Sequence, residues 1–138
     1  MLREAASSTR IITGELIPAN KPGTLAMAQR KPLDVCLGIA PWNAPIILRV
    51  RAVATALACG NTVILKASEL CPATQRTIGQ VFQDAGFTPG VVNMLTNAPE
   101  DAPEVKHVNF TGSTSVDRII GERAVRNLTP AILELGGK

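Results

Sequence analysis

Aromatic side chains are scarce in this sequence of 138 residues, which has one Trp, three Phe and no Tyr. Proteins that bind single-stranded nucleic acid stack bases on aromatic rings, and duplex-binding proteins carry a clustered basic patch. The net charge of +3 is small, and the basic residues are interspersed with acidic ones. We therefore expect no nucleic-acid partner.

Long apolar runs are also missing. No stretch approaches the roughly 20 apolar residues that span a bilayer, so we expect no membrane segment. Met1–Gly14 contains Arg and Ser but carries Glu4 and has no apolar signal core, so it does not read as a targeting peptide. We expect a cytoplasmic protein.

Cysteine and histidine are too few, and too irregularly spaced, for a disulfide framework or a metal centre. Cys36, Cys59 and Cys71 are odd in number and lack metal-ligand spacing, and the chain has one His. Such cysteines behave as small apolar residues or free thiols in a reducing compartment. We expect no bound metal.

The hydrophobic pattern alternates between short strand-like runs and helical stripes. The predicted strands are Leu33–Ala40, Thr62–Leu65, Val91–Leu95, Val108–Phe110 and Ala131–Leu135. The predicted inward stripes of the helices are Ile46, Val50, Val53 and Leu57; Ile78, Val81, Phe82 and Ala85; and Val116, Ile119 and Ile120. Alternating strands and helices predict the α/β class, here a partial doubly wound, Rossmann-like, mostly parallel sheet covered on both faces.

The amino-terminal part differs from this pattern. Residues 1–9 resemble the end of a helix, and residues 10–32 read as an extended β pair around the turn Ala19–Gly23. An isolated strand pair is marginally stable, so we expect this pair to pack on another subunit as an oligomerisation element. Residues 33–138 form the partial doubly wound domain.

Four predicted strands end in polar or glycine-rich tips. Ligands of open α/β sheets bind beyond the carboxyl ends of the strands, so these tips are the candidate site. A solvated Lys66/Glu69 pair is the simpler interpretation of the second tip taken alone. The four tips are Pro41–Asn43, Lys66–Glu69, Phe110–Thr114 and Glu134–Lys138.

All four tips, in this order, resemble those of the aldehyde dehydrogenase superfamily, and the resemblance covers nearly the whole chain. Ala40–Pro45 and Cys59–Pro72 are most similar to the aromatic-aldehyde members of the salicylaldehyde or vanillin type. The resemblance implies NAD-dependent oxidation of an aromatic aldehyde to a carboxylic acid, in a homo-oligomer. It makes residues 33–138 a partial NAD-binding domain.

Two residues match catalytic positions of this family. Asn43 matches the residue whose amide stabilises the oxyanion, an effect typically worth about 2.7–4 kcal/mol per donor; the alternative is an Asn that caps a loop. Glu134 matches the general base that activates water against the acyl intermediate, a role that needs a carboxylate near the reacting carbon.

The remaining matches concern the cofactor. Lys66 and Glu69 match the pair that holds the adenosine ribose, and the Glu69 charge would repel a 2′-phosphate, so NAD is preferred over NADP. Gly112, Ser113 and Thr114 match the pyrophosphate turn at a helix N-terminus. The other cofactor-lining positions are Ile39, Ala40, Trp42, Ser68, Gly90, Phe110, Leu135 and Gly136. Gly90 and Phe110 are equally suited to a turn and to the core.

The sequence departs from the family pattern at two places. Asp117 stands where the family usually has Gly, and a carboxylate there is a poor neighbour for a diphosphate. Thr114 and Asp117 also have capping-box spacing, which gives Asp117 a structural alternative. The crossover of residues 96–106 is too short, with Pro99 and Pro103, for the helix that the family carries, so a loop crossover is expected.

The family's nucleophile is a cysteine well downstream of the Glu134–Lys138 motif. We therefore expect a fragment without that cysteine and without the catalytic and substrate-binding domain. No His or helix N-terminus is evident beside Cys36, Cys59 or Cys71 to activate one as a substitute. The alternative is a non-catalytic fragment that binds nucleotide or pairs with other subunits. A generic Rossmann domain would carry an early Gly-x-Gly-x-x-Gly, which is absent.

Overall fold

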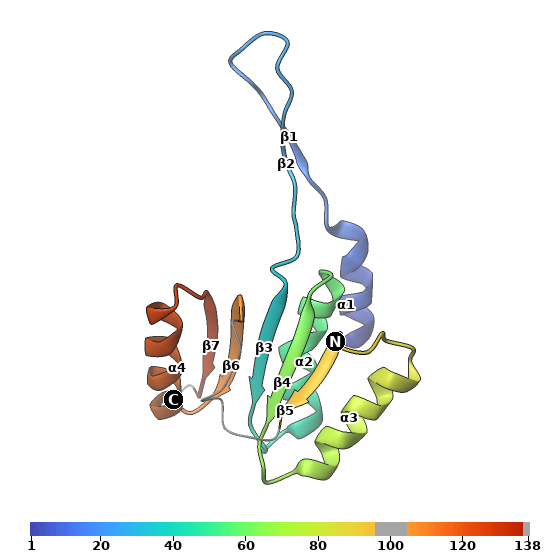
Figure 1. Ribbon diagram of the computed structural model, residues 1–138, viewed down its shortest axis with the longest axis vertical. Helices are drawn as coiled ribbons and strands as arrows, with labels where there is room; N and C mark the ends of the chain where they lie inside the picture. The colour runs from blue at the N-terminus through green and yellow to red at the C-terminus, as the bar shows by residue number, and fades with distance from the viewer. Residues whose placement is uncertain (96–104, 137–138) are drawn as a thin grey trace.

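The computed structural model describes residues 1–95 and 105–136. A five-stranded sheet with helices on both faces forms the body, and a two-stranded ribbon projects from it (Figure 1). The sheet strands are β3 (Val35–Ala40), β4 (Thr62–Ala67), β5 (Val92–Leu95), β6 (His107–Gly112) and β7 (Ala131–Leu135). The helices are α1 (Leu2–Ser8), the 3₁₀ turn η1 (Thr9–Ile11), α2 (Pro45–Ala58), α3 (Pro72–Asp84) and α4 (Thr114–Arg126).

The five strands lie in the order β5-β4-β3-β6-β7, and every neighbouring pair is parallel. The chain builds outward from β3 to β5, then returns to the other side of β3 with β6. This is the strand order of a doubly wound sheet, whose direction reverses between β3 and β6. The predicted fold class is confirmed. The predicted loop crossover lies largely in residues 96–104, outside the described residues.

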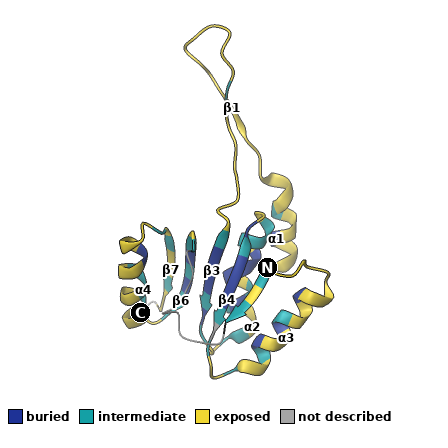
Figure 2. Cartoon of the chain, viewed as in Figure 1, coloured by how far each residue is buried: buried dark blue, intermediate teal, exposed yellow. Residues whose placement is uncertain are grey.

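Each face of the sheet has its own core. Beneath α2 and α3, strand residues such as Cys36, Val63 and Leu65 pack with helix residues such as Val53 and Phe82. On the opposite face the buried residues are Leu37, Ile64 and Val108, with Ile120 of α4 packed against them. Figure 2 shows the burial concentrated in β3 and β4, the middle of the sheet. These strands therefore hold the carboxyl-terminal rim in place.

The end of α2 is a glycine turn. Gly60 has φ +82°, a left-handed conformation that glycine adopts without strain. The N–H of Gly60 bonds to the Leu57 carbonyl at 2.9 Å, and that of Asn61 bonds to the Ala56 carbonyl at 3.1 Å. This is a Schellman motif, and it turns the chain directly into β4.

The predicted inward stripes of the helices are partly wrong. Ile46 is 62% exposed and Val81 is 56% exposed, and Ala85, Val116 and Ile119 are also exposed. The buried helix positions include instead Arg49, Gln75 and Ala124. Apolar periodicity shows which residues share a face, but the way each helix lies on the sheet decides which part of that face is covered.

The ribbon pairs β1 (Glu15–Ile17) with β2 (Ala26–Ala28) in antiparallel register. It extends away from the sheet (Figure 1), with Leu16, Leu25 and Met27 exposed. The extended β pair is therefore present as predicted. Its role in oligomerisation stays a prediction.

Candidate functional site

The predicted tips of β3, β4, β6 and β7 all lie at the carboxyl-terminal edge of one parallel sheet. The register places Ile39 of β3 opposite Lys66 of β4 on one side and opposite Phe110 of β6 on the other. Gly112 at the end of β6 pairs with Leu135 at the end of β7. Residues separated by up to about a hundred positions thus share one rim.

The topological switch point lies between β3 and β6, where ligands of doubly wound sheets bind. After β3 the chain passes Trp42 and Asn43, both exposed, and begins α2 at Pro45. After β6 it begins α4 at Thr114. The structure therefore places Asn43 and Ser113 after the two strands that flank the switch point.

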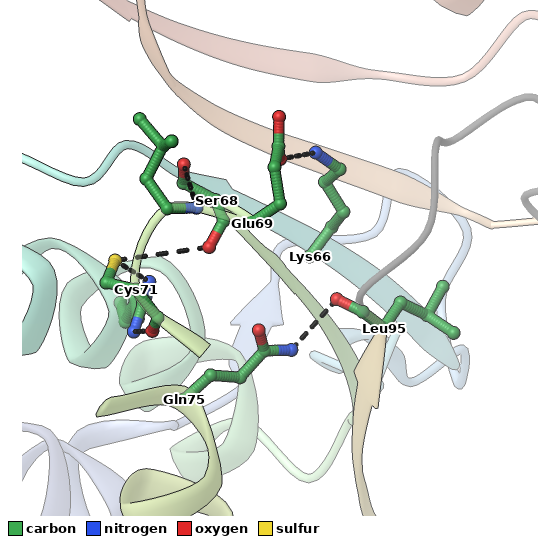
Figure 3. A network of polar contacts seen from close by, with 8 residues as sticks. Lys66, Ser68, Glu69, Cys71, Gln75 and Leu95 are labelled. Atoms are coloured by element: carbon green, nitrogen blue, oxygen red, sulfur yellow. Dashed lines mark hydrogen bonds and ion pairs between the residues drawn. The ribbon is translucent and has the colours of Figure 1, made fainter. Parts of the chain in front are cut away.

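The β4 tip carries an ion pair. Lys66 Nζ lies 3.6 Å from Glu69 Oε2, and the Lys66 side chain is 18% exposed against 73% for Glu69. Figure 3 shows the two charged groups facing each other, with Ser68 between them in sequence; its Oγ accepts the Leu70 N–H at 3.3 Å. The Glu69 backbone N–H and then Lys66 hold the pKa of the Glu69 carboxyl below its ordinary value of 4.5. Glu69 is an ionised, accessible acceptor at neutral pH.

The β6–α4 turn differs from the predicted capping box. Ser113, in an extended conformation, is the N-cap of α4, and no side chain makes a capping bond there. Thr114 is already helical, so it and Asp117 do not form the box. The backbone N–H of Asp117 bonds to the Ser113 carbonyl at 3.0 Å. Asp117 Oδ1 is buried, with no hydrogen-bond partner in the part of the chain that the structure describes.

Gly112 has a steric reason to be glycine. A Cβ atom built there would lie 2.5 Å from Cζ of Phe110, closer than any real contact. The Phe110 ring is 3% exposed, so it has little room to move away. The ring thus lies against the backbone of Gly112 at the end of β6, and Phe110 is a core residue. Its role as a cofactor wall stays a prediction.

Glu134 near the end of β7 forms an ion pair with Arg51 of α2, and the Thr111 hydroxyl donates to the same carboxylate at 3.4 Å. Side chains alternate between the faces of a sheet, and the contact with α2 puts Glu134 on the α2 face. Lys66 alternates with buried Leu65 and lies on the α4 face with Ile64. Sequence reasoning missed Arg51, because no local signal links a helix position to a strand so far along the chain.

Gly90 is not brought to this rim. It precedes β5 with φ +89°, which puts it at the amino-terminal edge of a parallel sheet, opposite the other candidates. Its left-handed conformation supports the turn interpretation instead. Leu135 and Gly136 lie at the end of β7 and are exposed. Gly137 and Lys138 are outside the described residues.

A groove of about 500 Å³ lies between α2 and the β6–β7 part of the sheet, with Arg51, His107 and Ile132 in its lining. It contains none of the predicted site residues and extends toward the amino-terminal ends of the strands. In residues 1–95 and 105–136, no cluster of three or more His, Cys, Asp or Glu side chains is arranged to hold a metal ion. Within the same ranges, no helix is both long and apolar enough to cross a membrane.

Comparison with known proteins shows the family of this chain. Residues 1–138 match the model of the aldehyde dehydrogenase family over their full length. The chain belongs to the aldehyde dehydrogenase family.

Particular members are similar throughout the chain. Vanillin dehydrogenase of Pseudomonas fluorescens is 62% identical over 148 positions that cover 100% of this chain and 31% of that protein. The crystal structure of a salicylaldehyde dehydrogenase from Pseudomonas putida G7 with salicylaldehyde superimposes with a TM-score of 0.92 at 45% identity, covering 99% of this chain and 30% of that chain. An NAD⁺ complex of an aldehyde dehydrogenase from Bacillus cereus gives a TM-score of 0.90 at 32% identity, covering 99% and 29%. The chain thus spans a little under a third of the length of these relatives.

Proposed function

We propose that this chain is the cofactor-binding part of an enzyme that oxidises an aromatic aldehyde to a carboxylic acid with NAD in the cytoplasm. The observation that carries the proposal is the position of Asn43 and Ser113 on the two sides of the β3–β6 switch point, with the Lys66–Glu69 pair on the next strand. The similarity to vanillin and salicylaldehyde dehydrogenases supports an aromatic substrate.

The residues at the β4 tip fit an adenosine ribose. Ionised Glu69 accepts hydrogen bonds from the 2′- and 3′-hydroxyls and repels a 2′-phosphate, which favours NAD over NADP. Lys66, Ile39 and Phe110 line one face of the rim, with Trp42 and Ala40 at its β3 end. The α4 N-terminus offers N–H groups to the diphosphate, but Asp117 in its first turn carries a charge of the wrong sign. We therefore expect the affinity for NAD to be reduced.

Bound NAD supplies the hydride acceptor. The side-chain amide of Asn43 donates to the carbonyl oxygen of the aldehyde as that oxygen gains negative charge. Glu134 removes a proton from the water that hydrolyses the acyl intermediate. In the described structure Arg51 and Thr111 both contact Oε2 of Glu134, so Oε1 is the oxygen available to that water.

The nucleophile is proposed to lie outside this chain. Cys36 belongs to β3 and is buried, Cys59 follows α2, and Cys71 precedes α3. The cysteine of the family lies after the Glu134–Lys138 motif, and no cysteine here matches it. The isolated chain should therefore bind NAD without oxidising aldehydes.

Trp42 makes the binding step directly measurable, because it is the single tryptophan of the chain and is 59% exposed. NAD should change Trp42 fluorescence in a saturable way. Glu69→Gln should weaken NAD binding and reduce the ratio of the affinity for NAD to the affinity for NADP. The control Glu122→Gln, on the exposed side of α4, should leave the NAD affinity and this ratio unchanged. Saturable binding of NADP in preference to NAD by the unmodified chain would overturn the cofactor assignment.

An activity assay with vanillin or salicylaldehyde and NAD tests the nucleophile. We expect no NADH absorbance from the isolated chain. Turnover that persists after Cys36, Cys59 and Cys71 are all replaced by serine would exclude catalysis through a thiohemiacetal. Turnover that disappears would place the nucleophile within this chain.

We also propose that the β1–β2 ribbon joins copies of the protein into a homo-oligomer. Its Leu16 and Met27 are exposed, and in the described part of the chain no third strand pairs with its outer edges. Replacing both residues by lysine should shift the mass measured by light scattering toward the monomer. An unchanged mass would exclude the ribbon as the interface.

A further inference from the structure

Arg49 lies inside the protein, and within residues 1–95 and 105–136 no carboxylate is paired with it. It occupies α2 and is 0% exposed. Its Nη2 donates to Cys71 Sγ at 2.6 Å, and its Nη1 donates to the Cys71 carbonyl at 3.4 Å. Its Nε is buried without a hydrogen-bond partner among the described residues, and none of the ion pairs found there involves Arg49. The guanidinium is thus directed at one cysteine.

A buried positive charge is costly unless an anion faces it. Among the described residues, the group that the Arg49 guanidinium contacts and that can become an anion is the Cys71 sulfur. Besides Arg49, Sγ contacts the Ser68 carbonyl at 3.9 Å (Figure 3), a weak contact. A negative charge on this sulfur would lie directly beside the Arg49 guanidinium.

The position of Cys71 adds a second favourable field. Cys71 is the N-cap of α3, a helix of 13 residues, and the N-terminal end of a helix attracts negative charge. Its side chain is only partly buried, so small reagents have access to it. The expectation that no helix N-terminus lies beside a cysteine is therefore wrong for Cys71.

The other two cysteines serve as comparisons within the same molecule. Burial, and then the nearby Cys59, raise the pKa of the Cys36 thiol. Cys59 is exposed, but it is the C-cap of α2, where the helix dipole disfavours an anion. Accessibility alone predicts that Cys59 reacts first, whereas the local charges predict that Cys71 does.

We propose that Cys71 is a modification site, a nucleophilic thiol activated by Arg49 that reacts with small electrophiles and with hydrogen peroxide. In the peroxide reaction the sulfur attacks one oxygen and the O–O bond breaks. The departing hydroxide takes up a proton to give water, and Cys71 becomes a sulfenic acid. Sulfur loses two electrons and the peroxide gains them. The proposal is independent of NAD and of aldehyde oxidation.

The test is limited alkylation of the intact chain with iodoacetamide, in which the sulfur displaces iodide, followed by mass spectrometry of the peptides. Cys71 should be alkylated roughly tenfold faster than Cys59, as expected for a thiol beside a cation and a helix N-terminus. Arg49→Met should remove this advantage and leave the Cys59 rate unchanged, while Arg49→Lys, which keeps the charge, should retain part of it.

Labelling with dimedone after exposure to hydrogen peroxide gives a second readout, and the mass increase should fall on Cys71. Because Arg49→Met removes a buried group, the circular dichroism of this variant and the alkylation rate of its Cys59 show whether the variant is folded. If the variant is unfolded, the ratio of the Cys71 to the Cys59 alkylation rate in the unmodified chain tests the proposal. Faster alkylation of Cys59 than of Cys71, or a Cys71 rate unaffected in folded Arg49→Met, would overturn the proposal.

Discussion

Arg51 of α2 is ion-paired with Glu134 of β7, so the proposed general base faces the α2 side of the sheet. Lys66, at the proposed ribose site, faces the α4 side. The candidate site therefore lies across the edge of the sheet instead of on one of its faces. A ligand that reaches both groups has to pass over the carboxyl-terminal rim, near the switch point between β3 and β6.

Glu134→Gln should cost little stability. The side chains of Arg51 and Glu134 are 42% and 43% exposed, and an ion pair so accessible to water is typically worth about 0.2–1 kcal/mol. Urea unfolding should show a decrease of less than about 1 kcal/mol. A loss of several kcal/mol would mean that the pair holds the fold together, which would weaken the case for a catalytic carboxylate.

Binding of NAD should depend on pH through Glu69. Since the pKa of this carboxyl is lowered in the folded chain, its negative charge is present above the ordinary value of 4.5 and is lost only when the pH falls through the lower folded value. The contribution of this carboxylate to the stability of the folded chain is likewise present above pH 4.5 and is lost as the pH falls through the lower folded pKa. Affinity measured by Trp42 fluorescence should stay level from neutral pH to pH ~5 and decline below, and Glu69→Gln should remove the decline. A decline centred above pH ~6 would implicate another group.

Asp117→Asn should strengthen NAD binding. The substitution removes a negative charge from the first turn of α4 while it keeps the side-chain size, and the helix N-terminus then faces the diphosphate without competition. A several-fold decrease in Kd by calorimetry is expected, with Glu122→Gln on the same helix as the matched control. Equal effects of the two changes would indicate a general charge effect and not a local one.

Asn61→Ala should destabilise the chain by about 1–3 kcal/mol. Asn61 is 6% exposed, its Nδ2 donates to the Ala56 carbonyl at 2.9 Å, and its Oδ1 accepts the Leu33 N–H at 2.5 Å. Alanine leaves both backbone groups without this partner. Asn127→Ala is the matched control, since Asn127 also bonds to its own helix, at 2.9 Å to the Arg123 carbonyl, but is exposed. Equal shifts in the urea midpoint would contradict the role of burial.

Much of the fold follows from short-range patterns. Thr62–Leu65 is strand-like through its β-branched residues, and Pro72 stands at the start of α3, a position that suits proline. Gly60 follows α2 in the left-handed conformation that glycine favours. These features depend on neighbours within a few positions, which is the range over which propensity and periodicity act.

The helix faces and the contacts of the polar side chains could not be predicted in this way. Arg49 lies outside the predicted stripe of α2 yet is completely buried. Nothing in the sequence around Arg51 indicates that it pairs with Glu134 on β7. Gly90 is a predicted cofactor-lining residue but lies at the amino-terminal edge of the sheet. A glycine before a strand suits a turn and a ligand site equally well, and only the fold shows at which edge of the sheet it lies.

The amino-acid sequence alone determined the alternation of strands and helices and the chemistry that stands at each strand tip, because both are properties of consecutive residues. The tertiary structure decided which tips share the carboxyl-terminal edge of the sheet, which face each side chain occupies, and that a buried guanidinium lies against Cys71. Those outcomes depend on pairing between distant segments. The interaction energy arises only when the two residues are brought into contact, so neither residue alone predicts it.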